Sequence, residues 1–243
     1  MSDQKEIAID DTPFYKSLRK RSNVLLFMKD GKIRNNLSGV DEYQKSILET
    51  CLRISSLFKT LRLSRFFLGE RLNIPVDSDL KIKNAEFIRY HIECYFIRIT
   101  TFKDLIVKLF NRTFKLDKKE GNGLFQNVKN EAQKQNITNL LNLLNDLENL
   151  LKNVAPIRNK ITYGDYYDAI DLVSIEAEEL IKNTGKGTSM KNDEYKAVLN
   201  KFLTKNIIEM YKIEVAMATY TLRAYKDLYK VRRAKEKTLK DFK

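Results

Sequence analysis

Residues 84–115 read NAEFIRYHIECYFIRITTFKDLIVKLFNRTFK, and the spacing of their apolar side chains sets the pattern for the rest of the chain. Apolar residues step by four and three without a break, at Ile88, Ile92, Tyr95, Ile99, Phe102, Ile106 and Leu109. This spacing places them on one face of an α-helix, because positions three and four apart lie above one another. The sequence therefore predicts a long helix over about 84–115 with one buried face.

The same period continues on both sides of this stretch. Thr12-Pro13 predicts the start of a short helix that runs to about residue 21. Longer helices are predicted over about 41–72, through Leu140–Val154 up to Pro156, from about Asp168, and over about 195–230. On the helix from Asp168, the pattern predicts an inward face made of Ile170, Val173, Ala177 and Leu180. Gly121-Asn122-Gly123 predicts a loop.

Composition agrees with long helices. Only 8 Gly and 3 Pro occur in 243 residues, which disfavours sandwiches, barrels and Rossmann sheets because these folds need many tight turns. We expect an all-α protein, an antiparallel bundle of about five long helices over 41–230. Residues 1–40 are expected to form an irregular appendage with a small hairpin around Asp30-Gly31, and residues 231–243 a basic tail.

Several classes of protein are disfavoured. The longest apolar run, Val24–Met28, is too short to span a bilayer, and the polar, acidic N-terminus is unlike a signal peptide. Cys51 and Cys94 fall on predicted apolar faces and are expected to be reduced, which favours the cytoplasm. With His91 as the sole histidine, neither a zinc site of ordinary spacing nor a serine or cysteine triad is available. No metal or cofactor is predicted.

The polar junction PIRNKITYGDYYD, residues 156–168, is the strongest candidate for chemistry. Arg158 carries a permanently charged, planar donor fork that suits the oxygens of a phosphodiester. The alternative is a structural arginine that pairs with Asp165 or Asp168, or caps the carbonyl groups of the preceding helix.

The order of these elements resembles the HEPN superfamily of all-α domains. The likeness covers about residues 85–230 and rests on the helix HIECYFIR through Asp104, followed by a Leu-rich helix that ends in Ile157-Arg158-Asn159. The family's motif is an arginine, a polar residue and a histidine four to six residues beyond. Arg158 and Asn159 match the first two positions, whereas Tyr163 stands where the histidine is expected.

The resemblance implies a metal-independent endoribonuclease that acts as a homodimer, with both copies of the motif lining one cleft. In such enzymes the ribose 2′-OH attacks the adjacent phosphate, the arginine stabilises the developing charge and the histidine transfers the proton. Tyr163 is a poor base, because with a reference pKa of ~10 only about one molecule in a thousand is ionised at pH 7. It could still donate a proton.

His91 is a second candidate for proton transfer, with Arg98 two turns further along the same side of the helix. The alternative is a histidine at the edge of the core that binds a carboxylate such as Glu93 or Asp104. Net charge of +13 and two basic ends favour a polyanionic partner. The candidate RNA-binding residues are Arg98, Lys160, Arg232 and Arg233, and the alternative for each is a solvated charge.

The sequence thus predicts a HEPN-like RNA-binding protein, with Arg158, Asn159, Tyr163 and His91 as the candidate catalytic residues. The resemblance suggests a bacterial toxin–antitoxin or antiphage system, a homodimer and an antitoxin or defence-system partner, and no membrane. One alternative is a catalytically reduced HEPN domain that binds nucleic acid or protein without cutting. A plain helical scaffold is the other.

Overall fold

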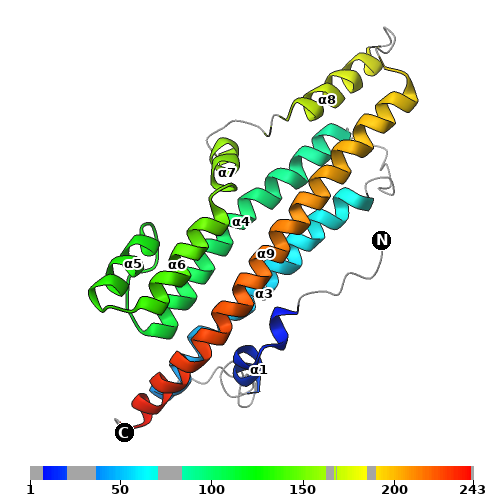
Figure 1. Ribbon diagram of the computed structural model, residues 1–243. Helices are drawn as coiled ribbons and strands as arrows, with labels where there is room; N and C mark the ends of the chain where they lie inside the picture. The colour runs from blue at the N-terminus through cyan, green and yellow to red at the C-terminus, as the bar shows by residue number, and fades with distance from the viewer. Residues whose placement is uncertain are drawn as a thin grey trace. The chain divides into compact units, whose positions relative to one another are not determined.

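A computed structural model describes residues 8–20, 37–70, 84–162, 167, 169–184 and 190–241 (Figure 1). All regular secondary structure within these residues is helical, which confirms the all-α prediction. The elements are the short 3-10 helix η1 (Ile9–Asp11) and the α-helices α1 (Pro13–Arg19), α3 (Gly39–Glu70), α4 (Asn84–Phe114), α5 (Leu124–Lys134), α6 (Thr138–Leu151), α7 (Ala155–Thr162), α8 (Ile170–Asn183) and α9 (Asn192–Asp241).

The five longest helices, α3, α4, α6, α8 and α9, correspond to the five long helices predicted from the apolar period. Helix α1 begins as expected, because the Thr12 side chain accepts a hydrogen bond from the Tyr15 amide and Pro13 occupies the first turn. Two features differ. The short helices α5 and α7 were not predicted separately, and α9 continues to Asp241 through most of the expected tail. The predicted hairpin around Asp30-Gly31 lies outside the described residues.

The chain divides into two compact units, and α3, α4 and α9 each contribute one part to both. Unit 1 comprises residues 1–57, 101–151 and 215–243. Unit 2 comprises residues 58–100 and 152–214. The junction that follows α6, with its Arg-Asn pair, belongs to unit 2.

Unit 1 has a closely packed apolar core between α1, α6 and its parts of α3, α4 and α9, and α5 lies beside α6 (Figure 1). Side chains with no exposed surface include Ile47, Ile106, Leu109, Leu144 and Tyr225. Two buried phenols donate to main-chain carbonyl oxygens, Tyr43 to Thr113 and Tyr220 to Leu143, each at 2.7 Å. These bonds satisfy groups that burial would otherwise leave unpaired, and they join α3 to α4 and α9 to α6.

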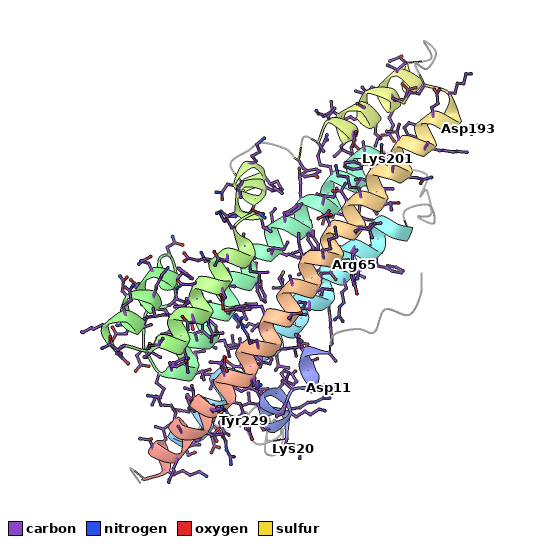
Figure 2. The ribbon with its side chains drawn as sticks, viewed as in Figure 1. Asp11, Lys20, Arg65, Asp193, Lys201 and Tyr229 are labelled. Atoms are coloured by element: carbon purple, nitrogen blue, oxygen red, sulfur yellow. The ribbon has the colours of Figure 1, made fainter. Side chains whose placement is uncertain are left out.

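Unit 2 packs α8 and its parts of α3, α4 and α9 around Leu61, Leu68, Ile88, Ile92 and Tyr95, all fully buried. The Tyr95 hydroxyl donates to the Met210 carbonyl oxygen at 2.6 Å, which joins α4 to α9. Arg65, labelled in Figure 2, pairs with the buried Glu214 of α9 at 3.0 Å between Nε and Oε1. Burial nevertheless raises the pKa of Glu214, against the opposing effect of Arg65.

Helix α8 is turned the opposite way from its prediction. Ile170, Val173 and Leu180 are 84%, 47% and 50% exposed, and Ala177 is exposed as well. The buried face carries Leu172 and Ile175, together with the carboxylates of Glu178 and Glu179.

The inward carboxylates of α8 are stabilised by donors that the apolar period does not reveal. Glu176 accepts two bonds from Arg89, at 3.2 and 2.5 Å, and Glu178 accepts one from the Met190 amide at 3.2 Å. Glu179 accepts from the Ala85 amide at 3.2 Å and from the Tyr195 hydroxyl at 2.6 Å. Because these charge-assisted bonds satisfy the buried carboxylates, the acidic face can point inward and the apolar stripe remains outside.

Candidate functional site

The Arg158–Asn159 pair lies on the short helix α7, whose first turn contains Pro156. Proline is favoured there because its missing N–H would have no partner in the helix, so Pro156 starts α7 after the break that follows α6. The Arg158 amide donates to the Val154 carbonyl oxygen at 3.1 Å. Arg158 Nη1 donates to Asn159 Oδ1 at 3.1 Å. The Arg158 side chain is half-buried and that of Asn159 is exposed. The side-chain amide of Asn159 therefore helps to orient the Arg158 guanidinium at the surface.

Tyr163, the residue at the family's histidine spacing, lies outside the described residues. The segment is described again at Tyr167, whose backbone and side chain both contact neighbouring helices. The Tyr167 amide donates to Glu93 Oε1 of α4 at 3.0 Å, and its hydroxyl donates to Asn206 Oδ1 of α9 at 3.2 Å. Its ring stacks on Phe96 at 6.1 Å between centroids. The far end of the junction is therefore fixed to α4 and α9.

Tyr167 was missed by the sequence analysis. Its only signal was a pair of tyrosines, Tyr166-Tyr167, inside an otherwise polar run. Glu93 was considered as a carboxylate partner for His91, but it accepts a hydrogen bond from the Tyr167 backbone amide instead. Asp104 is exposed and belongs to unit 1.

His91 faces away from this junction. It lies two residues before Glu93, about 200° around α4, and so occupies the opposite side of the helix from the carboxylate that holds Tyr167. Its described neighbours are the rings of Phe87, Phe67 and Tyr90, at centroid distances of 4.3, 5.4 and 5.3 Å. Neither expected environment, a carboxylate partner or a place beside Arg158, matches these contacts.

Burial lowers the pKa of His91, and the nearby Arg98 charge lowers it further. His91 is therefore a neutral, flat ring at neutral pH. Arg98, as predicted from the helical spacing, lies on the same side of α4, and its Nη1 reaches Ser64 Oγ of α3 at 3.5 Å. Lys160, on α7, is exposed.

Arg232 and Arg233 occupy opposite environments despite being neighbours. Arg232 is 2% exposed and pairs with Glu236 at 3.0 Å between Nε and Oε1. Its Nη2 donates to Ser17 Oγ of α1 at 2.9 Å, and its guanidinium lies 5.5 Å from the Phe14 ring centroid. Burial lowers its pKa, although Glu236 opposes this. Arg232 thus ties α9 to α1 inside unit 1 and cannot reach RNA, whereas Arg233 is exposed.

Both cysteines are free thiols, as expected, with Cys51 buried and Cys94 half-buried. Burial raises the pKa of Cys51 to about 12, so that thiol is protonated at neutral pH. Over the described ranges, no cluster of three or more His, Cys, Asp or Glu side chains could hold a metal ion. In the same part of the chain, no helix has an apolar stretch long enough to cross a membrane.

The arrangement of long α4, Leu-rich α6 and the Arg-Asn pair on α7 agrees with the comparison to known families. The model of the Cthe2314-like HEPN family matches residues 74–231, well over half of the chain. The protein therefore belongs to the HEPN superfamily and carries a HEPN-like domain of nucleotide-binding or ribonuclease type. Searches of curated proteins and of solved structures gave no significant match.

Proposed function

We propose that this HEPN protein binds RNA and cleaves it as a metal-independent endoribonuclease, with Arg158 and Asn159 holding the scissile phosphodiester. The observation that carries the proposal is the Arg158–Asn159 hydrogen bond of 3.1 Å at the surface of α7. A guanidinium oriented in this way at the surface suits the binding of phosphate oxygens, and charge-assisted bonds of this kind are among the strongest in proteins.

In the proposed reaction, the ribose 2′-oxygen attacks the adjacent phosphorus as its proton passes to a water molecule. The bond from phosphorus to the 5′-oxygen breaks, and that oxygen takes up a proton. The products are a 2′,3′-cyclic phosphate and a 5′-hydroxyl. Arg158 stabilises the charge that builds on the phosphoryl oxygens, a task for which a fixed charge is well suited. Tyr163, at the family spacing, is the candidate donor to the leaving oxygen.

The second candidate function is RNA binding without cleavage. His91, the sole histidine, faces away from the junction within its own chain, so the group that HEPN enzymes use for proton transfer is missing beside Arg158. The chain carries a net charge of +13, which supports binding of a polyanion under either function.

The family resemblance supports a role in a toxin–antitoxin or antiphage system. Such a role predicts antitoxin or defence genes beside the gene for this protein.

We further propose a homodimer, since the HEPN site that this protein resembles is built from two copies of the motif. Exposed Ile170, Val173 and Leu180 on α8 support an assembly, because apolar side chains aligned on one helix face are more stable when another surface covers them. Light scattering at tens of micromolar measures the mass, and a monomer there would remove the two-chain site.

Cleavage is tested on a broad RNA panel in EDTA, with product ends identified by mass spectrometry. Arg158→Ala should lower the rate by about 10²–10³, as removal of a donor to a developing oxyanion does. Arg53→Ala is the matched control, because it removes the same charge from an exposed site on α3 in unit 1. Tyr163→His should raise the rate, since a group with a near-neutral pKa then stands at the family spacing.

The outcomes separate the two functions. Cleavage that persists in EDTA, ends in a cyclic phosphate and needs Arg158 supports the enzyme. An intact panel with wild-type protein, combined with cleavage by Tyr163→His, supports the binding module. Arg158→Ala protein that fails to fold would show that Arg158 is structural.

A further inference from the structure

Unit 2 carries a continuous aromatic surface on α3 and α4 that has no role in the proposed reaction. Phe66, Phe67 and Tyr90 are 56%, 39% and 61% exposed. Exposed rings are usually scattered singly, and grouped ones mark a binding surface.

His91 joins these rings into one surface. Centroid distances run 6.0 Å from Phe66 to Phe67, 5.4 Å from Phe67 to His91, and 5.3 Å from His91 to Tyr90. Phe87 supports His91 from one side at 4.3 Å. We call Phe66, Phe67, Tyr90 and His91 the aromatic platform. Leu63 lies one turn before Phe67 on the same face of α3 and is 50% exposed. Ile97 lies two turns after Tyr90 on the same face of α4 and is 45% exposed.

Positive charge lies at one end of the aromatic platform. Arg98 follows His91 by two turns on α4 and reaches Ser64 of α3 at 3.5 Å. Because α3 and α4 run antiparallel here, Lys59 and Arg62 of α3 lie toward the same end. On α4, Glu86 stands one turn before Tyr90, at the other end of the platform from Arg98.

We propose that the aromatic platform stacks unpaired bases of single-stranded RNA while Arg98 contacts the phosphate backbone beside them. The proposal rests on the RNA-binding function proposed above and adds how the RNA is held outside the Arg158 junction. Flat rings next to cations are the combination that single-strand binders use, since every base offers a π-face and every linkage a charge. RNA suits the platform better than a protein partner does, because aromatic rings dominate the platform and the cation Arg98 lies at its end.

The test uses full-length protein and fluorescein-labelled 2′-O-methyl oligonucleotides, which lack the attacking hydroxyl and so resist cleavage. One 12-mer carries bases, and a second 12-mer has the same backbone without bases. Fluorescence anisotropy gives both dissociation constants. We expect the base-bearing strand to bind at least tenfold more tightly, because stacking needs bases whereas phosphate contacts do not.

Variants then locate the stacking surface. The double change Phe66→Ala with Tyr90→Ala should weaken binding of the base-bearing strand about tenfold or more and leave the abasic strand unchanged. Ile208→Ala, which trims an exposed apolar residue on α9, is the matched control and should change neither constant. Arg98→Ala should weaken the binding of both strands alike. It should also lower the slope of log affinity against log salt concentration by about one.

A direct reporter is available because the chain has no tryptophan. Tyr90→Trp places a single indole on the platform, and stacking of a base should quench its fluorescence. The abasic strand should leave the fluorescence unchanged. Quenching by the base-bearing strand, with no quenching by the abasic strand, supports the proposal. This readout does not depend on a variant that binds RNA more weakly or folds less well.

Three results would overturn it. One is equal binding of both strands by wild-type protein, and another is unchanged base-dependent affinity in the double variant. The third is a double variant that loses its oligomeric state but keeps its RNA affinity, which would make the platform an interface between copies. If wild-type protein binds neither strand nor any RNA, the proposed function fails as well, and that pattern differs from all three.

Discussion

The two units differ in how many large apolar side chains they expose, although both bury charged groups. In unit 1, Leu52 is the one large apolar side chain, among the described residues, that is strongly exposed. A charged residue, Arg232, is buried there instead. Unit 2 exposes the aromatic platform and the α8 stripe, and turns the carboxylates of α8 inward. The difference suggests that unit 1 mainly supplies stability, while unit 2 offers surfaces to other molecules.

The largest expected effect concerns the buried charge of unit 1. Arg232→Ala should lower the free energy of unfolding by about 3–5 kcal/mol, because it removes the cation that pairs with the buried Glu236 and leaves only the neutral Gln44 amide bound to it. Arg233→Ala removes the neighbouring exposed charge and should change stability by less than about 0.5 kcal/mol. Urea denaturation followed by circular dichroism measures both. Similar losses for the two variants would contradict the burial of Arg232.

The next effect tests the orientation of α8 in unit 2. Leu172→Ala should cost about 2–5 kcal/mol, since Leu172 is fully buried. Val173→Ala should cost less than about 0.5 kcal/mol, because its side chain is 47% exposed. The apolar period alone predicts the reverse order. A larger loss for Val173→Ala in a protein shown to be monomeric would restore the predicted orientation.

The smallest effect is a pH dependence at the aromatic platform. The pKa of His91 is lowered in the folded protein, by burial first and then by Arg98. Between that pKa and the unfolded value of ~6.5, the unfolded chain binds more protons, so stability should fall as the pH falls through this window. His91→Phe keeps a ring and removes the titration. Urea midpoints of the two proteins should therefore diverge below about pH 6.5, and a constant difference from pH 7.5 to 5 would contradict the shift.

Local sequence patterns predicted the structure correctly where one strong pattern pointed to a single arrangement. The stripe from Ile88 to Leu109 is fully buried along α4, because large apolar side chains at helical spacing have few alternatives to a core position. The start of α1 at Thr12-Pro13 was likewise predictable, because it depends on local hydrogen bonds and not on distant residues.

The failures share one physical cause. The inward face of α8 was predicted from its apolar side chains alone, and Arg232 was predicted to bind RNA or lie in solvent. The α8 carboxylates and Arg232 instead face inward, where they bind partners outside their own helix. Glu179 binds the amide of Ala85, 94 positions earlier. Tyr167 was missed in the same way, since nothing near it in the sequence points to Glu93, 74 positions before it. Local patterns do not contain such pairings.

The contacts of Arg232 also have a consequence for synthesis of the chain on the ribosome. Arg232 binds Ser17, 215 positions before it, and α1 presents Phe14, Tyr15 and Leu18 to a core that α9 helps to close. At about 5–20 residues per second, α1 must wait roughly 10–40 s for this part of α9 to be made. All segments of unit 2 have been translated by then. The apolar face of α1 is thus a site where chaperones can act during translation. In a nascent chain halted before Arg232, this face should remain uncovered.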